Sequence, residues 1–165
     1  SEQDELTWVP MESNPDMMNE FAQKLGQNLS LYTFQDCWGL DEELLAFVSQ
    51  PCIAIILLFP FPLDDIDDKT AVGDPKNVIW IPQLVNNACG TMAVLHAICN
   101  NLEEITEGEP CQLRNFVSKI SSMSFEERGE FLTKFQGIKE AHSDVVQHGS
   151  TKAPAVGEKV DHHFA

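Results

Sequence analysis

The sequence predicts a single domain of mixed helices and strands, of the α+β class. Two patterns carry this prediction. Apolar residues recur at the spacing of one helix face in several segments, and two short apolar runs are typical of interior strands. The chain has 165 residues, of which 43% are hydrophobic, and this is enough to bury one continuous core. We therefore expect one domain over residues 1–165.

The N-terminal part carries start and stop signals for two helices. Ser13 or Asn14 can cap free backbone N–H groups and Pro15 fits a first helical turn, so a helix is predicted over Pro15 to Leu25, ended by Gly26. A second, shorter helix is predicted over Glu42 to Val48, because Asp41 precedes it and a Gln-Pro pair follows it.

Two strands are predicted in the middle of the chain. The run from Ile53 to Phe59 is rich in branched apolar residues and too short for a buried helix of ordinary length. Residues 60–77 contain five Asp together with Pro and Gly, which is typical of a solvated connection. A second strand is predicted over Val78 to Ile81.

The C-terminal half alternates between helical and irregular patterns. Helices are predicted over Ala88 to Asn101, over Gln112 to Ile120, and after Ser124, which opens a capping-box sequence. Ser143 to Glu158 lacks periodicity, and a stretch of this length is typical of a functional loop or a disordered segment. Lys159 to Ala165 alternates as a strand does.

Composition bears on the class of protein and on its partners. No apolar run approaches the roughly 18 residues of a membrane span, and the acidic start of the chain does not resemble a secretory signal. We therefore expect a soluble, cytoplasmic protein that crosses no membrane. The formal charge of −16 disfavours nucleic acid and anionic lipid, and it favours a basic protein or peptide as ligand.

The five cysteines do not form a disulfide framework or a zinc site, because their number is odd and no Cys-x-x-Cys pair occurs. In a reducing compartment the ordinary interpretation of each one is a small buried hydrophobe. Only Cys89 has surroundings that argue otherwise, because the residues beside it are small or polar.

Cys89 follows a predicted strand and a short loop, and it stands in the first turn of a predicted helix. Unpaired N–H groups and the helix dipole favour a thiolate at such a position, so Cys89 is a candidate nucleophile. Acyl transfer also needs donors for the developing oxyanion, and the amide of Gln83, six residues upstream, is a candidate. The alternative for Gln83 is an exposed polar residue at a strand end.

A thiol nucleophile needs a base, and the chain offers five histidines. His96 is excluded because it lies seven residues along the same helix, roughly 10 Å away. His142 and His148 flank or lie in the predicted irregular loop, where we expect no rigid placement. His162 and His163 alternate on the last strand, and the face of His162 is the more apolar one. His163 is therefore the better candidate.

The stretch VIWIPQLVNNACGTMAVLHAICNN, residues 78–101, resembles the ubiquitin carboxyl-terminal hydrolase family, the papain-like deubiquitinases. The signature of that family is a Gln six residues before the nucleophile of an Asn-x-Cys-Gly-Thr motif. The likeness continues over nearly the whole chain, through WVPMESNP at 8–15, ELLAFVSQP at 43–51, IILLFP at 55–60, MSFEERGEFL at 123–132 and KAPAVGEKVDHHF at 152–164.

The resemblance implies a papain-like cysteine-protease fold, in which helices flank a central antiparallel sheet. It implies Cys89 as the nucleophile, Gln83 as the oxyanion-hole amide, and His163 as the general base and proton donor. The implied reaction is thiol-dependent hydrolysis of small adducts, or of peptide and isopeptide bonds, at the C-terminal Gly of ubiquitin.

The resemblance also implies a partner and a role for the irregular segment. Residues 143–158 would form a crossover loop that limits what can pass through the active site. The partner would be ubiquitin or a ubiquitin-like modifier, bound in part through the segment near residues 9–15. No cofactor and no metal are implied, and a monomer is expected.

The sequence departs from the family at one point. The family completes its triad with an Asp in a Leu-Asp-Gly-Arg motif after the His, and these 165 residues lack that motif. Asp161 is a poor substitute, because same-face neighbours on a strand lie roughly 6.5 to 7 Å apart. We therefore expect the chain to lack the C-terminal strands of the fold. Two alternatives stay open: a non-catalytic ubiquitin-binding or regulatory fragment, and a papain-like peptidase of general specificity.

Overall fold

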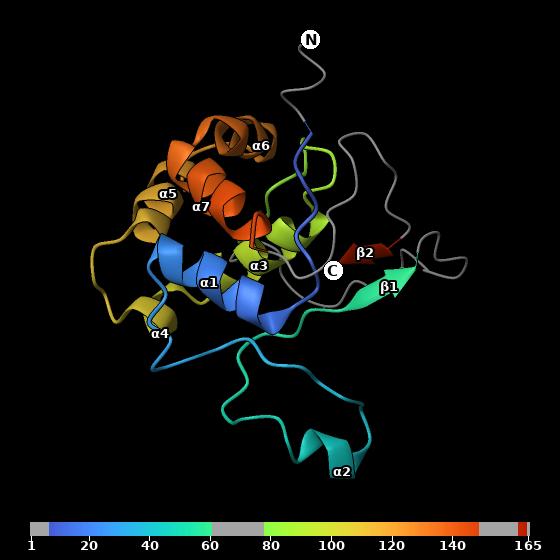
Figure 1. Cartoon of the computed structure of the whole chain (residues 1–165). Coiled ribbons are helices and arrows are strands. Elements are labelled where there is room, and N and C mark those ends of the chain that lie inside the picture. The colour runs from blue at the N-terminus through green and yellow to red at the C-terminus, as the bar shows by residue number, and fades with distance from the viewer. Residues whose placement is uncertain (1–6, 61–77, 149–161, 165) are drawn as a thin grey trace, which may run out of the picture.

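The computed structural model describes residues 7–60, 78–148 and 162–164. In chain order, its elements are α1 (Pro15–Leu25), α2 (Glu42–Leu45), β1 (Leu58–Pro60), α3 (Cys89–Cys99), α4 (Leu102–Thr106), α5 (Gln112–Ile120), α6 (Phe125–Lys134), α7 (Gln136–Val146) and β2 (His162–Phe164) (Figure 1). The described residues thus combine helices with two short strands, and this confirms the coarse α+β prediction.

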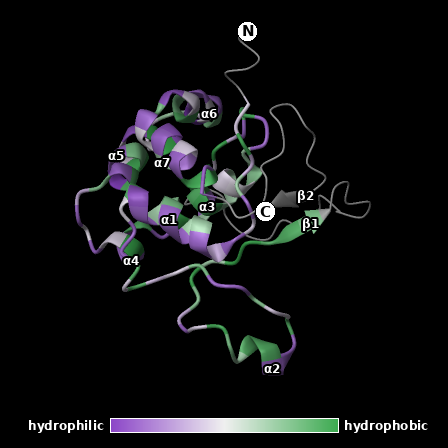
Figure 2. Ribbon diagram, in the orientation of Figure 1, coloured by the Kyte–Doolittle hydropathy of each residue, from purple (hydrophilic) through white to green (hydrophobic). Residues whose placement is uncertain are grey.

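Most helices gather into one body around α3. Helix α1 packs against α7, α3 and α5, while α6 packs against α5 and α7. Helix α3 is hydrophobic almost all round (Figure 2), because it is covered on most of its sides. The core consists mainly of the buried faces of these helices, and its largest fully buried side chains include Phe21, Leu25, Leu95, Phe116 and Ile138.

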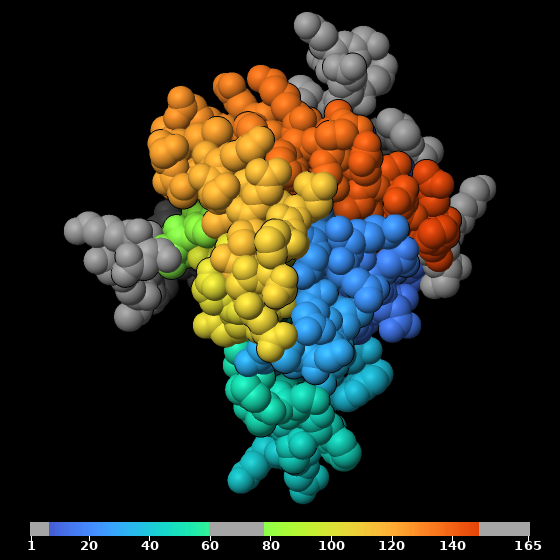
Figure 3. Space-filling view, turned by 90° about the vertical axis from the view of Figure 1, so that its left-hand side faces the viewer, coloured from blue at the N-terminus to red at the C-terminus, as the bar shows by residue number. Residues whose placement is uncertain are grey.

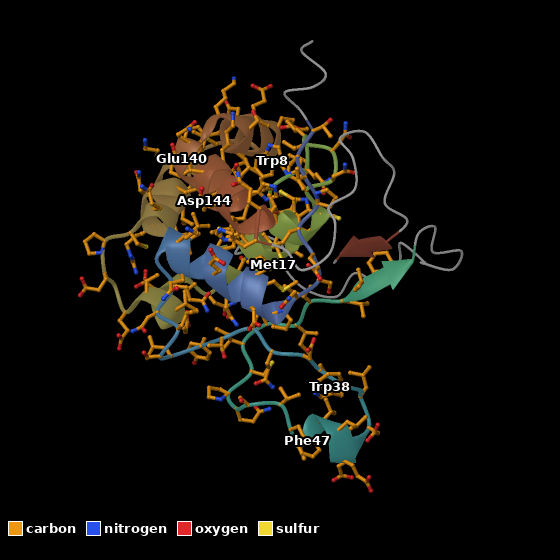
Figure 4. The ribbon with its side chains drawn as sticks, in the orientation of Figure 1. Trp8, Met17, Trp38, Phe47, Glu140 and Asp144 are labelled. Carbon is orange, nitrogen blue, oxygen red and sulfur yellow. The ribbon has the colours of Figure 1, made fainter. Side chains whose placement is uncertain are left out.

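The loop that carries α2 projects away from this body (Figures 1 and 3). Large apolar side chains are exposed on it: Trp38 and Phe47, labelled in Figure 4, are 74% and 75% exposed. Helix α2 itself has no buried residue. The predicted second helix ends at Leu45, three residues earlier than expected, because no core contact extends it.

Helices α1 and α5 have the bounds that the sequence predicted, α6 begins after Ser124 as predicted, and α1 and α6 have the expected caps. The Asn14 side chain accepts the N–H of Asp16 at 2.9 Å, and Gly26 ends α1 in the left-handed region, at φ 112°. Ser124 and Glu127 form the capping box of α6. Helix α5 also matches its prediction.

Two helices were missed. Helix α4 has five residues, which is too few to show a period, and α7 begins after Phe135 without a side-chain cap. The prediction of an irregular stretch from Ser143 is wrong for Ser143 to Val146, which form the last turn of α7. Residues 149–158 of that stretch lie outside the described residues, as do residues 61–77 of the Asp-rich connection.

The strand predictions hold only in part. Of the predicted strand over Ile53 to Phe59, only the end is paired, as β1. It pairs antiparallel with β2, with Phe59 opposite His163. Strand β2 confirms three residues of the last predicted strand, and its backbone lies against α3. Residues 78–81 are not a strand, and their backbone is bonded instead to the side chains of His96 in α3 and of Asn100 at its C-cap.

Candidate active site

Cys89 is the first residue of α3, as the sequence predicted, and it is partly exposed. Ala88 precedes it at the N-cap and provides no side-chain cap. The first N–H groups of a helix have no partner within the helix, so the first turn of α3 adds a positive partial charge beside the thiol. Gly90 follows Cys89 and is buried. Because glycine has no side chain, this residue does not crowd the backbone beside the sulfur.

The turn before Cys89 is fixed by the N-terminal segment at Asn86 and by the core at Ala88. Trp8 donates its N–H to the carbonyl of Asn86 at 3.0 Å, and Thr7 forms an isolated parallel bridge with Asn86. Asn87 takes the left-handed conformation, at φ 62°, which Asn tolerates better than most residues. The side chain of Ala88 is fully buried in the core. The N-terminal segment and the core therefore fix the path of the chain into the nucleophile helix.

Gln83 is exposed, and its amide Nε2 donates to the carbonyl of Val85 at 2.9 Å. This bond ties the carboxamide to its own loop and gives it a set orientation. The amide nitrogen carries two hydrogens, and the bond to Val85 uses one of them. Gln83 was predicted as an oxyanion donor, and that role stays a prediction.

The structure describes the backbone of His163 in β2, which lies against the helix that Cys89 begins. The topology thus brings together a helix from the middle of the chain and a strand from its C-terminal part. The side chain of His163 lies outside what the structure describes, as does Asp161, so the pairing of His163 with Cys89 stays a prediction.

His142 is held rigidly, so the expectation of a mobile position is wrong. It lies in α7 with 4% of its surface exposed, and its Nδ1 is 2.8 Å from the Thr91 hydroxyl. Its ring lies against that of Trp8, with centroids 4.5 Å apart (Figure 4 labels Trp8). Burial lowers the pKa of His142 to about 4, which keeps the imidazole neutral. The sequence missed this because α7 has no start signal.

His96 is excluded as the base, but it has another function in the structure. Its Nε2 accepts the backbone N–H of Ile81 at 3.1 Å, and its ring stacks on Trp80. Burial lowers the pKa of His96, and this favours the neutral form that can accept a hydrogen bond. His148 is exposed, with its Nδ1 3.5 Å from Glu20 on α1.

All five cysteines are free thiols. Burial raises the pKa of Cys99 to about 12, so that thiol is inert. The prediction that the cysteines other than Cys89 are buried is wrong for Cys37 and Cys52, which are exposed, and Cys111 is partly exposed where it caps α5. Among the described residues, no cluster of His, Cys, Asp or Glu could hold a metal ion, and no helix is suited to cross a membrane.

Comparison with known proteins gives consistent matches over this site. The model of a family described as ubiquitin carboxyl-terminal hydrolase, family 1, matches residues 8–165. A ubiquitin carboxyl-terminal hydrolase of Aplysia californica is 36% identical over 97% of this chain and 76% of its own length. One of Drosophila melanogaster is 36% identical, over 96% and 72% respectively. Ubiquitin carboxyl-terminal hydrolase 3 of Arabidopsis thaliana is 37% identical, over 95% and 69%.

Proposed function

Because the chain belongs to the ubiquitin carboxyl-terminal hydrolase family, we propose that its substrates are small adducts and peptide or isopeptide bonds at the C-terminal Gly of ubiquitin. The protein is a cysteine-type deubiquitinase. The observation that supports Cys89 as its nucleophile is the position of this partly exposed thiol at the uncapped first turn of α3, within the Asn-x-Cys-Gly-Thr motif.

The reaction begins with attack of the Cys89 sulfur on the carbonyl carbon of the terminal Gly. His163 takes the thiol proton and then gives it to the leaving amine or alcohol. The product of this first step is a thioester between Cys89 and ubiquitin. Water, deprotonated by the same imidazole, then attacks the thioester carbonyl, which releases the ubiquitin carboxylate and restores the thiol.

Negative charge develops on the carbonyl oxygen in both steps. The backbone N–H of Cys89 and the second amide hydrogen of Gln83 are the proposed donors to that oxygen. The bond from Gln83 to Val85 supports this assignment, because it orients the carboxamide before substrate binds. Loss of one oxyanion-hole donor costs about 10²- to 10³-fold in kcat in other acyl-transfer enzymes.

The papain-like architecture, with a central antiparallel sheet, belongs to the same proposal, and the paired β1 and β2 are consistent with it. The proposal includes a crossover loop, predicted over residues 143–158, although residues 143–146 of it are the last turn of α7. The proposed role of this loop is to restrict entry to small leaving groups.

The proposed partner is ubiquitin or a ubiquitin-like modifier, with a basic C-terminal tail that complements the charge of −16. The same charge opposes binding to nucleic acid and to anionic membranes. We place the protein in the cytoplasm as a monomer, in the pathways that remove ubiquitin from conjugates.

The test is labelling with ubiquitin that carries a C-terminal electrophile. We expect one adduct, located at Cys89 by peptide mass mapping and lost in Cys89→Ala. Cys111→Ala is the matched control and should label normally, because Cys111 caps α5 away from the nucleophile turn. A chain that forms no adduct, while its Cys89→Ala variant still binds ubiquitin, would be a binding protein and not an enzyme.

A further inference from the structure

The residues 79–84, which we call the Gln83 strip, connect to the nucleophile turn and are bonded to two helices. The strand predicted over residues 78–81 is absent among the described residues. A backbone without strand partners must find other hydrogen bonds, and here side chains from α3 and α6 provide them.

One side chain of α3 and one from its C-cap hold the start of the strip. Asn100 accepts the N–H of Ile79 at 2.7 Å and donates to the carbonyl of the same residue at 3.0 Å, so it acts as a strand partner would. His96 accepts the N–H of Ile81 at 3.1 Å. The side chain of Ile81 is only 1% exposed, which anchors this point of the strip in the core.

Trp80 adds contacts to both helices. Its ring stacks on the His96 imidazole, with centroids 4.6 Å apart and planes at 10°. Its carbonyl accepts from the Arg128 guanidinium of α6 at 3.3 Å. The same guanidinium donates through Nε to the carbonyl of Ile120 at 3.2 Å, so its position is set by the end of α5.

Helix α6 also packs directly on the residues that flank Gln83. A Cβ built on Gly129 would lie 2.7 Å from Cγ of Pro82 and 3.0 Å from Cδ1 of Leu84. Only a glycine permits this approach. The strip therefore has α3 side chains on one side and the α6 backbone on the other, with Gln83 between two of the packed residues.

We propose that His96 is a positioning residue, which holds the Gln83 strip on the helix that begins with Cys89. The inference rests on the proposed function. One rigid helix then carries the nucleophile and, seven residues later, the acceptor that fixes the strip of the oxyanion donor. Each reacting group is thus placed relative to α3. Misplacement by about 1 Å costs about 10²-fold in rate in enzymes that depend on such geometry.

Two variants of His96 separate the effect of its hydrogen bond to Ile81 from the effect of its stacking on Trp80. His96→Gln keeps an acceptor near the position of Nε2 and loses the stacked ring, while His96→Phe keeps a ring against Trp80 and loses the acceptor. Turnover is measured on ubiquitin with a fluorogenic C-terminal amide, at saturating and limiting concentrations. Thiol reactivity is measured separately with iodoacetamide, whose displacement reaction needs no oxyanion donor.

We expect His96→Phe to lower kcat by about ten- to a hundredfold, with KM within about twofold and Cys89 alkylation unchanged. His96→Gln should keep most of the activity. In a Gln83→Ala background, His96→Phe should have no further effect, because it acts through Gln83. Equal losses in the Phe and Gln variants, a loss of kcat that persists without Gln83, or a parallel fall in alkylation would overturn the proposal.

Two further results separate this proposal from other failures. If His96→Phe does not fold, Asn100→Ala removes the exposed side chain that bonds to Ile79 at the start of the strip, and it should lower kcat by about two- to fivefold at constant KM. Full activity in that variant would overturn the proposal. A wild-type chain without turnover would overturn the proposed function itself, whereas an active wild type with an unaffected His96→Phe overturns only the role of His96.

Discussion

The Nδ1 atom of His142 lies 2.8 Å from the hydroxyl of Thr91, two residues after Cys89 in the nucleophile helix. Both residues are buried, with 4% and 0% of their surfaces exposed. The pair joins α7 to the first turns of α3 through a hydrogen bond that water does not reach. The neutral imidazole is favoured there, because burial lowers the pKa of His142 more than the Val9 backbone raises it.

This burial predicts a loss of stability in mild acid. The pKa of His142 is lowered by burial to about 4 in the folded chain, against 6.5 for the ordinary group. Between these values the unfolded chain binds a proton that the folded chain does not, so stability falls as pH drops from about 6.5 to about 4. The limit of the effect is about 3 kcal/mol in the free energy of unfolding. Above pH 6.5 this histidine contributes no pH dependence.

The measurement is urea unfolding at pH 7.5, 5.5 and 4.5. His142→Asn keeps an acceptor near Nδ1 for Thr91 and does not titrate, so it should lose less stability than wild type between the first and last pH values. Parallel pH profiles in the two proteins would contradict the assignment.

Thr91→Val should destabilise the protein by about 1–3 kcal/mol, because it leaves a buried ring nitrogen without its partner. Thr91→Ser keeps the hydroxyl and should recover most of this loss. Thr133→Val on α6 is the control, since the Thr133 hydroxyl bonds only to the carbonyl of Glu130 in an exposed setting. The measurement is the free energy of unfolding of each variant in urea. An equal loss in Thr91→Val and Thr133→Val would refute the contribution of the Thr91–His142 hydrogen bond.

Gly129→Ala should lower kcat and stability together. The added methyl group meets Pro82 and Leu84 beside Gln83, so the strip or α6 must shift, and overpacking of this kind costs about 1–3 kcal/mol. Gly137→Ala in α7 is the matched control, because its methyl group meets mainly the mobile end of Gln112. Thermal melts and turnover of a ubiquitin C-terminal amide test both variants. If Gly129→Ala keeps the wild-type melting temperature and turnover, Pro82 and Leu84 can move aside at little cost, and the prediction is wrong.

Gly26→Ala should destabilise the protein by about 3 kcal/mol or more. Gly26 has φ 112°, and a Cβ there would collide with the Cβ of Cys111 at the start of α5. Gly108→Ala provides the comparison, because Gly108 also has a positive φ, 81°, but open space around it. It should cost only about 1 kcal/mol, the conformational part of the effect. The difference between the two unfolding free energies measures the collision, and equal values would exclude it.

Local signals explain which elements could be predicted. Helices α1 and α5 match their predicted bounds and α6 begins where predicted, because a cap or a helical spacing of apolar residues acts within a few positions along the chain. The position of Cys89 at the start of α3 followed from the same kind of pattern. Helix α7 has no cap and was missed, and with it the burial of His142.

The sequence by itself determined the family, the nucleophile motif around Cys89 and the capped helices, because each depends on residue identity over short spans. Only the tertiary structure decided the path of residues 78–81 and the role of His96. An apolar run becomes a strand only if another strand pairs with it, and such a partner comes from a distant part of the chain. Here the side chains of Asn100 and His96 bond to that backbone in place of a neighbouring strand. The segment whose sequence predicts a strand therefore lies along the nucleophile helix.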